Sequence, residues 1–134
     1  MIIMMSPDRM RGLAKRLRRV LRGLGVELKH TECLDLAARL VGFNGWYDYL
    51  KRDLDASLSP LDDSLSEEVF AARDAFQISV LLSAGLGEVA RELLDRANPT
   101  GSWAQQSATT PRVERVGGND PGRWSENLSA RAED

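Results

Sequence analysis

Residues 6–25 read SPDRMRGLAKRLRRVLRGLG, and this stretch decides the fold class. Its apolar residues recur at spacings of three and four, which places them on one side of an α-helix. They are Met10, Leu13, Ala14, Leu17, Val20, Leu21 and Leu24. Ser6 and Pro7 are typical of the first residues of a helix, and Gly23 and Gly25 are typical of its exit. The stretch therefore predicts a long amphipathic helix.

The rest of this helix is strongly basic. Its cations are Arg9, Arg11, Lys15, Arg16, Arg18, Arg19 and Arg22, and we expect all of them to point outward. Residues 1–29 carry eight Lys or Arg and two acids, whereas residues 30–98 carry six and thirteen. A basic helix joined to an acidic body indicates an anionic partner or self-association. The candidate binding face consists of Arg11, Lys15, Arg18, Arg19 and Arg22.

Helical signals continue after residue 29. We expect Thr31 to begin a second helix that ends at Gly42, a glycine suited to a left-handed backbone position, and Asn44 to cap a third helix from Trp46 to Leu54. Ser64 and Glu67 match a capping box for a fourth helix. Its expected buried side carries Val69, Phe70, Ala72, Phe76, Val80, Leu81 and Ala84. A last short helix carries Val89, Ala90, Leu93 and Leu94.

These segments predict an all-α protein, a small bundle of about five helices with a disordered C-terminal tail. Residues 6–56 form a trihelical module with a basic first helix, and residues 64–98 form a helical pair that packs on it. A polar linker at 57–63 joins them. Residues 99–134 lack periodicity and are rich in Gly, Pro, Ser and Thr, so we expect them to be disordered. Trp103 and Trp124 are the large aromatic residues of this tail.

Residues 28–46, LKHTECLDLAARLVGFNGW, fit the pattern L-x-H-[ST]-x-x-L-[DE]-x-x-A-x-x-x-G-[FY]-x-x-W. This pattern resembles that of a small helical bacterial module labelled glyoxalase-related or of unknown function. The resemblance covers roughly residues 9–54, and its motif residues here are His30, Gly42, Phe43 and Trp46. It implies a protein of a plasmid or mobile-element system and, by its label, an enzyme.

The residues themselves do not predict that chemistry. Metal-dependent glyoxalases are similar to one another in building a metal site from His and Glu on paired strands, whereas this sequence holds one His and predicts no strand. Cys33 falls on an apolar helix side, where a buried thiol is unreactive. We therefore expect no catalytic residue, no cofactor and no metal. Trp46 is the expected core plug, packed on Leu17, Leu21 and Leu36 or Leu40, with an exposed anchor for a partner as the alternative.

The remaining function is binding. The 134 residues have a formal net charge of −2, contain one Cys, and include no apolar run long enough to span a membrane, which favours a cytoplasmic protein. The hypothesis is a non-catalytic adaptor or accessory factor that binds an acidic protein face. The alternatives are weak contact with a nucleic-acid backbone and, less favoured, a glyoxalase-related enzyme. Asp48, Asp53 and Asp55 beside the third helix disfavour the reading of bases.

Overall fold

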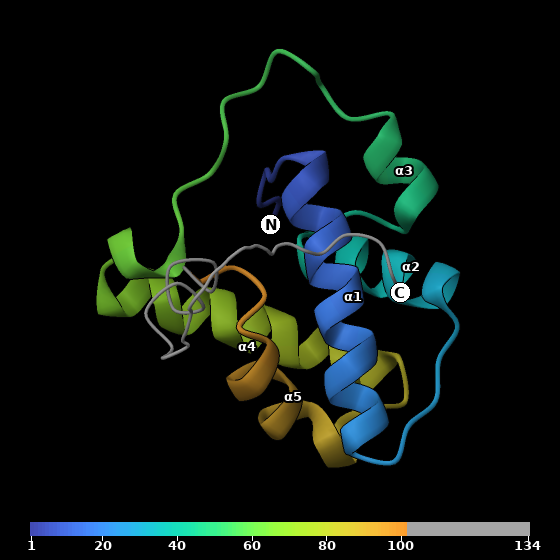
Figure 1. Ribbon diagram of the computed structural model, residues 1–134. Coiled ribbons are helices and arrows are strands. Elements are labelled where there is room, and N and C mark those ends of the chain that lie inside the picture. Colours follow the sequence, from blue (N-terminus) through green and yellow to red (C-terminus); the bar gives the residue numbers. More distant parts are fainter. Residues whose placement is uncertain (102–134) are drawn as a thin grey trace, which may run out of the picture. The chain divides into compact units, whose positions relative to one another are not determined.

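The computed structural model describes residues 1–101, which form five α-helices and no strand (Figure 1). The helices are α1 (Pro7–Gly23), α2 (His30–Leu40), α3 (Trp46–Leu50), α4 (Glu67–Ser83) and α5 (Ala90–Ala97), with 3₁₀ turns at Asp62–Ser64 and Gly87–Val89. The all-α class and the small bundle of about five helices are confirmed. The expectations for residues 102–134, including Trp103 and Trp124, lie outside the described residues.

Four helices enclose the core. α1 packs on α2 and α5, α2 also packs on α4, and α4 packs on α5, while α3 lies against α2 (Figure 1). The fully buried leucines of α1 are Leu13, Leu17 and Leu21, as the apolar spacing predicts. Val80, Leu81 and Leu93 fill the side of the core that α4 and α5 provide.

The segment before α1 contributes Ile3 and Met5 to this core, which the sequence did not predict. Ile3 and Met5 are each 2% exposed, and the Ile3 amide donates to the Val41 carbonyl at 2.8 Å. Gly42 has φ +103°, and a Cβ there would lie 1.8 Å from the Met1 carbonyl oxygen. Only glycine allows both this backbone and this approach. The expected left-handed position of Gly42 is therefore confirmed.

The helix starts separate into one correct and three corrected predictions. Ser6 caps α1 as expected, its hydroxyl accepting from the Arg9 amide. α2 begins two residues earlier than expected, with Lys29 rather than Thr31 at the cap, because Glu32 accepts from the Lys29 amide at 2.8 Å. The cap of α4 is Ser66, two residues beyond the expected Ser64.

The third corrected start is that of α3, where Asn44 is not the cap. The Asp35 carboxylate of α2 accepts from the Trp46 amide at 2.7 Å and takes the place of a local cap. The helix also ends at Leu50, four residues before the expected Leu54. Gly45 allows the close approach, because a Cβ there would lie 3.2 Å from the same Asp35 oxygen.

The segment expected to be a polar linker makes long-range contacts. The Ser59 hydroxyl accepts from the Met4 amide at 2.7 Å, and the Ser59 amide donates to the Met4 carbonyl at 2.9 Å. Asp62 forms a 3.0 Å ion pair with Arg73 of α4, with both side chains mostly buried. These bonds attach residues 57–63 to the N-terminal segment and to α4.

The tail was expected to begin at Pro99, and this boundary is wrong. Pro99, Thr100 and Gly101 are buried, and the Thr100 side chain is fully enclosed. Its hydroxyl donates to Asp62 at 2.8 Å and accepts from Gln77 at 3.1 Å. These bonds continue the core three residues past the predicted helix stop.

Candidate interaction surface

The basic residues of α1 occupy two different sides of the helix. Arg11, Lys15, Arg18 and Arg22 follow one another at spacings of three or four residues, with Arg19 next to Arg18, on a side of the helix away from the buried leucines. We call these five residues the α1 stripe. Arg9 and Arg16, seven residues apart, share another side that faces α5. The expectation that all seven cations point outward is therefore wrong for these two.

Arg9 and Arg16 bind the C-terminal end of α5. The Arg16 side chain is 8% exposed and donates to the carbonyls of Ala97 at 2.6 Å and Asn98 at 3.5 Å. Arg9 donates to the Gly101 carbonyl at 3.1 Å. Carbonyls at a helix C-terminus lack partners within the helix and carry partial negative charge, so the Arg16 cation stabilises them, while Arg9 binds the chain that follows α5. These two arginines are structural.

Burial leaves Arg16 less basic than a free arginine. Desolvation is the largest cause, followed by the positive charges of Arg19 and Arg9, and together they lower the pKa of Arg16 to about 9. The guanidinium is still protonated at neutral pH. The charge of Arg16 is therefore used inside the fold, and it does not contribute a free cation to the α1 stripe.

The α1 stripe itself is only partly neutralised. Arg22 forms a bidentate pair with Glu27 at 2.9 and 3.1 Å, and Arg11 lies 3.8 Å from Asp8 in an exposed pair. Lys15, Arg18 and Arg19 form no ion pair with any residue of 1–101. Like charges one turn apart on a helix repel by about 0.2–0.5 kcal/mol per pair. An anion from outside would relieve that repulsion.

One side-chain nitrogen of the α1 stripe and one at the start of α2 are buried. Arg18 Nε and His30 Nδ1 are closed to solvent and make no hydrogen bond within the described residues. Cys33, one turn after His30, is fully buried, and burial raises the pKa of its thiol despite the nearby charges of Arg18 and Arg22. The thiol is therefore protonated at neutral pH, as expected for an unreactive buried cysteine.

Tyr49, rather than Trp46, is the aromatic core plug. Tyr49 is fully buried and its hydroxyl donates to the Met5 carbonyl, whereas Trp46 is only partly buried. Trp46 stacks on the Tyr49 ring at 5.1 Å, and Phe43 meets that ring edge-on at 5.4 Å. The motif residues Phe43 and Trp46 therefore hold Tyr49 in place. Sequence reasoning missed Tyr49, although its spacing of three from Trp46 placed it on the same helix side.

The cations that follow α3 are engaged by aromatic rings. The Arg52 guanidinium lies 4.3 Å from the Tyr49 ring centre and also donates to the Tyr49 carbonyl. The Lys51 ammonium lies 4.7 Å from the Tyr47 ring centre. Cation–π contacts of this kind hold both side chains against their own segment.

A second charged surface lies at the start of α4. All residues from Ser66 to Ala72 are exposed, including Val69 at 51% and Phe70 at 43%. Val69, Phe70 and Ala72 were expected on the buried side of this helix, and that expectation is wrong because the core begins only at Arg73. Glu67 and Glu68 form no ion pair within residues 1–101. We call Glu67–Ala72 the α4 overhang.

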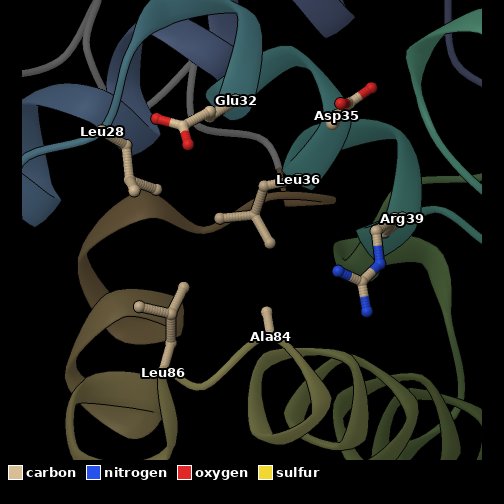
Figure 2. A pocket seen from close by; sticks show the side chains of 7 residues that line it. All are labelled: Leu28, Glu32, Asp35, Leu36, Arg39, Ala84 and Leu86. Carbon is tan, nitrogen blue, oxygen red and sulfur yellow. The ribbon is translucent and has the colours of Figure 1, made fainter.

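A groove of about 230 Å³ lies between α2 and the turn after α4 (Figure 2). Its lining residues are Leu28, Glu32, Asp35, Leu36, Arg39, Ala84 and Leu86. Figure 2 shows the leucines and Ala84 pointing into the hollow and Asp35 pointing away from it. The polar groups are already bonded: Glu32 and Asp35 cap helices, and Arg39 donates to the Ser83 hydroxyl. The groove therefore offers apolar contact rather than chemistry.

Residues 1–101 show neither a cluster of metal ligands nor a membrane-spanning helix. There, no three His, Cys, Asp or Glu residues gather as a metal site would require. Likewise, none of the helices in that part of the chain has the length and apolar character to cross a bilayer. No protein-family model, curated protein or solved structure matches the chain. The resemblance of residues 28–46 to the glyoxalase-related module stays a prediction from the motif.

Proposed function

We propose that this chain is a non-catalytic interaction protein whose α1 stripe binds an acidic surface of a protein partner. The observation that carries the proposal is a contrast in ion pairing. Arg73, Arg91 and Arg96 each lie within 3.0 Å of a carboxylate of their own fold. By contrast, Lys15, Arg18 and Arg19 of the α1 stripe have no carboxylate partner in residues 1–101, although their positive charges repel one another.

The charge of the remaining body favours a protein over a nucleic acid. Residues 30–98 carry thirteen acids and six Lys or Arg, and a negative body opposes the approach of a polyanion. An acidic protein surface presents fewer charges over a smaller area. The resemblance of residues 28–46 further supports an adaptor or accessory factor of a plasmid or mobile-element system, acting in the bacterial cytoplasm.

Contact with a nucleic-acid backbone is the second candidate function. The linear arrangement of the α1 stripe residues along the helix axis favours it. Arg11 and Arg22 are eleven residues apart, about 16 Å along a helix axis. Cations along such a line can contact successive phosphates. Reading of bases is not part of this candidate, because α3 has five residues and the cations after it lie on tyrosine rings.

Fluorescence anisotropy with the full chain tests both candidates. The probes are a labelled Glu/Asp-rich peptide and labelled duplex and single-stranded oligonucleotides, each titrated at low and physiological salt. The stripe variant is Lys15→Gln, Arg18→Gln and Arg19→Gln. The control variant, Lys51→Gln, Arg91→Gln and Arg96→Gln, removes the same number of charges from residues already engaged within the fold.

The proposal expects the peptide to bind the native chain and the control variant but not the stripe variant. Binding of duplex instead, with a salt slope of about −0.9 per phosphate contact, would establish the second candidate. Equal loss in both variants would show that only net charge matters and would contradict the proposal.

A separate experiment tests the proposal that the chain is not an enzyme. Purified chain is mixed with Zn²⁺, Ni²⁺ or Mn²⁺ and a methylglyoxal–thiol adduct, and conversion of the adduct is followed. The expected rate equals that of the metal alone. A faster rate that His30→Ala abolishes would identify an enzyme of the glyoxalase-related kind and overturn this part.

A further inference from the structure

The α4 overhang continues the inward side of its helix beyond the core. At about 100° per residue, Val69 and Phe70 fall on the same side of α4 as Arg73, Gln77 and Val80, which are buried. That side is covered from Arg73 onward. The two turns before Arg73 therefore present a core-like surface that no part of residues 1–101 covers.

The hydrogen bonds between α4 and the rest of the fold begin at Arg73. Arg73 donates to the Pro60 carbonyl and pairs with Asp62, while Gln77 donates to the Leu40 carbonyl and the Thr100 hydroxyl. These are the last bonds that the rest of the fold makes along α4 toward its N-terminus. An exposed aromatic and aliphatic pair with a charged rim is typical of an interaction site.

The charges of the α4 overhang are opposite to those of the α1 stripe. Glu67 and Glu68 have no cation within the described fold, and Lys15, Arg18 and Arg19 have no acid. The long stems of Lys and Arg can cover Val69, and a guanidinium can lie on the face of Phe70. Each surface thus offers what the other lacks, both in charge and in apolar contact.

We infer that the α4 overhang of one copy binds the α1 stripe of a second copy. This inference rests on the proposed function and names the acidic partner of the α1 stripe as the chain itself. Within residues 1–101 no ion pair joins the two surfaces, so the charges of each are available to a second copy. Formed twice about a two-fold axis, it closes a dimer in which both surfaces of each copy are occupied.

Sedimentation equilibrium of the full chain measures this association. The native chain is expected at twice its 14.9 kDa mass at micromolar concentration, with a dissociation constant that rises with salt. Phe70→Ser is expected to raise that constant by about tenfold or more, as truncation of a central aromatic does. Leu82→Ser is the matched control, because Leu82 is 59% exposed on another side of α4.

Charge exchange identifies the two surfaces as partners. One variant carries Glu67→Lys and Glu68→Lys, and the other carries Lys15→Glu, Arg18→Glu and Arg19→Glu. Each alone is expected to be monomeric, with circular dichroism confirming that it is folded. An equimolar mixture is expected to contain a mixed dimer, because both of its contacts then join opposite charges.

The outcomes separate this inference from the proposed function. A native chain that stays monomeric, or a dimer that none of these changes weakens, overturns the inference. If the monomeric chain still binds the acidic peptide through the α1 stripe, the proposed function stands and its partner is another protein. If neither dimer nor peptide binding depends on the α1 stripe, both fail.

Discussion

α1 and α4 are both seventeen residues long, and a serine caps the first turn of each, yet their apolar residues are buried to different extents. The apolar side of α1 is covered along its length by α2 and α5. α4 is covered only from Arg73 onward, and apolar residues such as Leu82 also lie on its outer sides. The length and the capping of a helix depend on residues near it in sequence. The burial of its apolar side depends on where distant segments of the chain end.

The largest expected effect comes from the fully covered helix. Leu17→Ala should lower the free energy of unfolding by about 2–5 kcal/mol, because it leaves a cavity in the packed core. Leu82→Ala in α4 should change it by less than about 0.5 kcal/mol. Urea denaturation of both variants measures the difference. Equal costs would mean that the two helices are covered alike.

The sequence predicts well those features of a helix that depend on residues close together in the chain. The apolar spacing of residues 10–24, the Ser6 cap and the left-handed Gly42 all depend on residues a few positions apart, and each is confirmed. The same local rules could not choose between Ser64 and Ser66. Both precede a helix, and the 3₁₀ turn that ends at Ser64 decides for the later serine.

The rest of the candidate site depends on long-range contacts that no local pattern carries. Arg16 is buried because the α5 carbonyls, 81 residues away, lie against it. Tyr49 displaces Trp46 from the core because the Met5 carbonyl, 44 residues away, accepts its hydroxyl. The exposure of Phe70 follows from where the cover of α4 ends. Two spacings in the sequence did carry a signal: the seven residues between Arg9 and Arg16, and the three between Trp46 and Tyr49.

The second largest effect on the free energy of unfolding is expected at the Arg73–Asp62 ion pair, where the buried part of α4 begins. Asp62→Ala should cost about 3 kcal/mol, because it leaves the mostly buried Arg73 guanidinium without its carboxylate. Asp62→Asn, which keeps an acceptor in the same place, should cost less. Urea denaturation at neutral pH gives both values. A negligible loss for Asp62→Ala would show that this ion pair does not anchor the buried half of α4, and that its other contacts suffice.

A smaller loss is expected where the chain after α5 meets α4. Thr100→Val keeps the shape of the side chain but removes its hydroxyl, so Gln77 and Asp62 each lose a hydrogen bond. The expected cost is about 1–2 kcal/mol. Thermal unfolding followed by circular dichroism measures it. No change would mean that Thr100 contributes only volume to the cover of α4.

The smallest effect is an electrostatic link between α4 and α5. Arg91 donates to both Asp74 oxygens at 2.7 and 2.9 Å, and this hydrogen bonding, more than charge alone, holds the pKa of Asp74 below its ordinary value of 3.8. A carboxyl with a lowered folded pKa contributes stability above its unfolded pKa and loses it as the pH falls through the folded value. Arg91 is 57% exposed, so the contribution is about 0.2–1 kcal/mol.

Asp74→Asn should therefore lower the urea midpoint at pH 7, and the difference from the native chain should shrink as the pH falls below 3.8. Glu88→Gln is the control, since Glu88 is exposed and has no ion pair within residues 1–101. It should leave the midpoint unchanged at both pH values. A loss for Asp74→Asn that persisted undiminished in acid would assign the effect to packing. The half of α4 joined to α5 would then be held as the leucines of α1 are, by apolar burial.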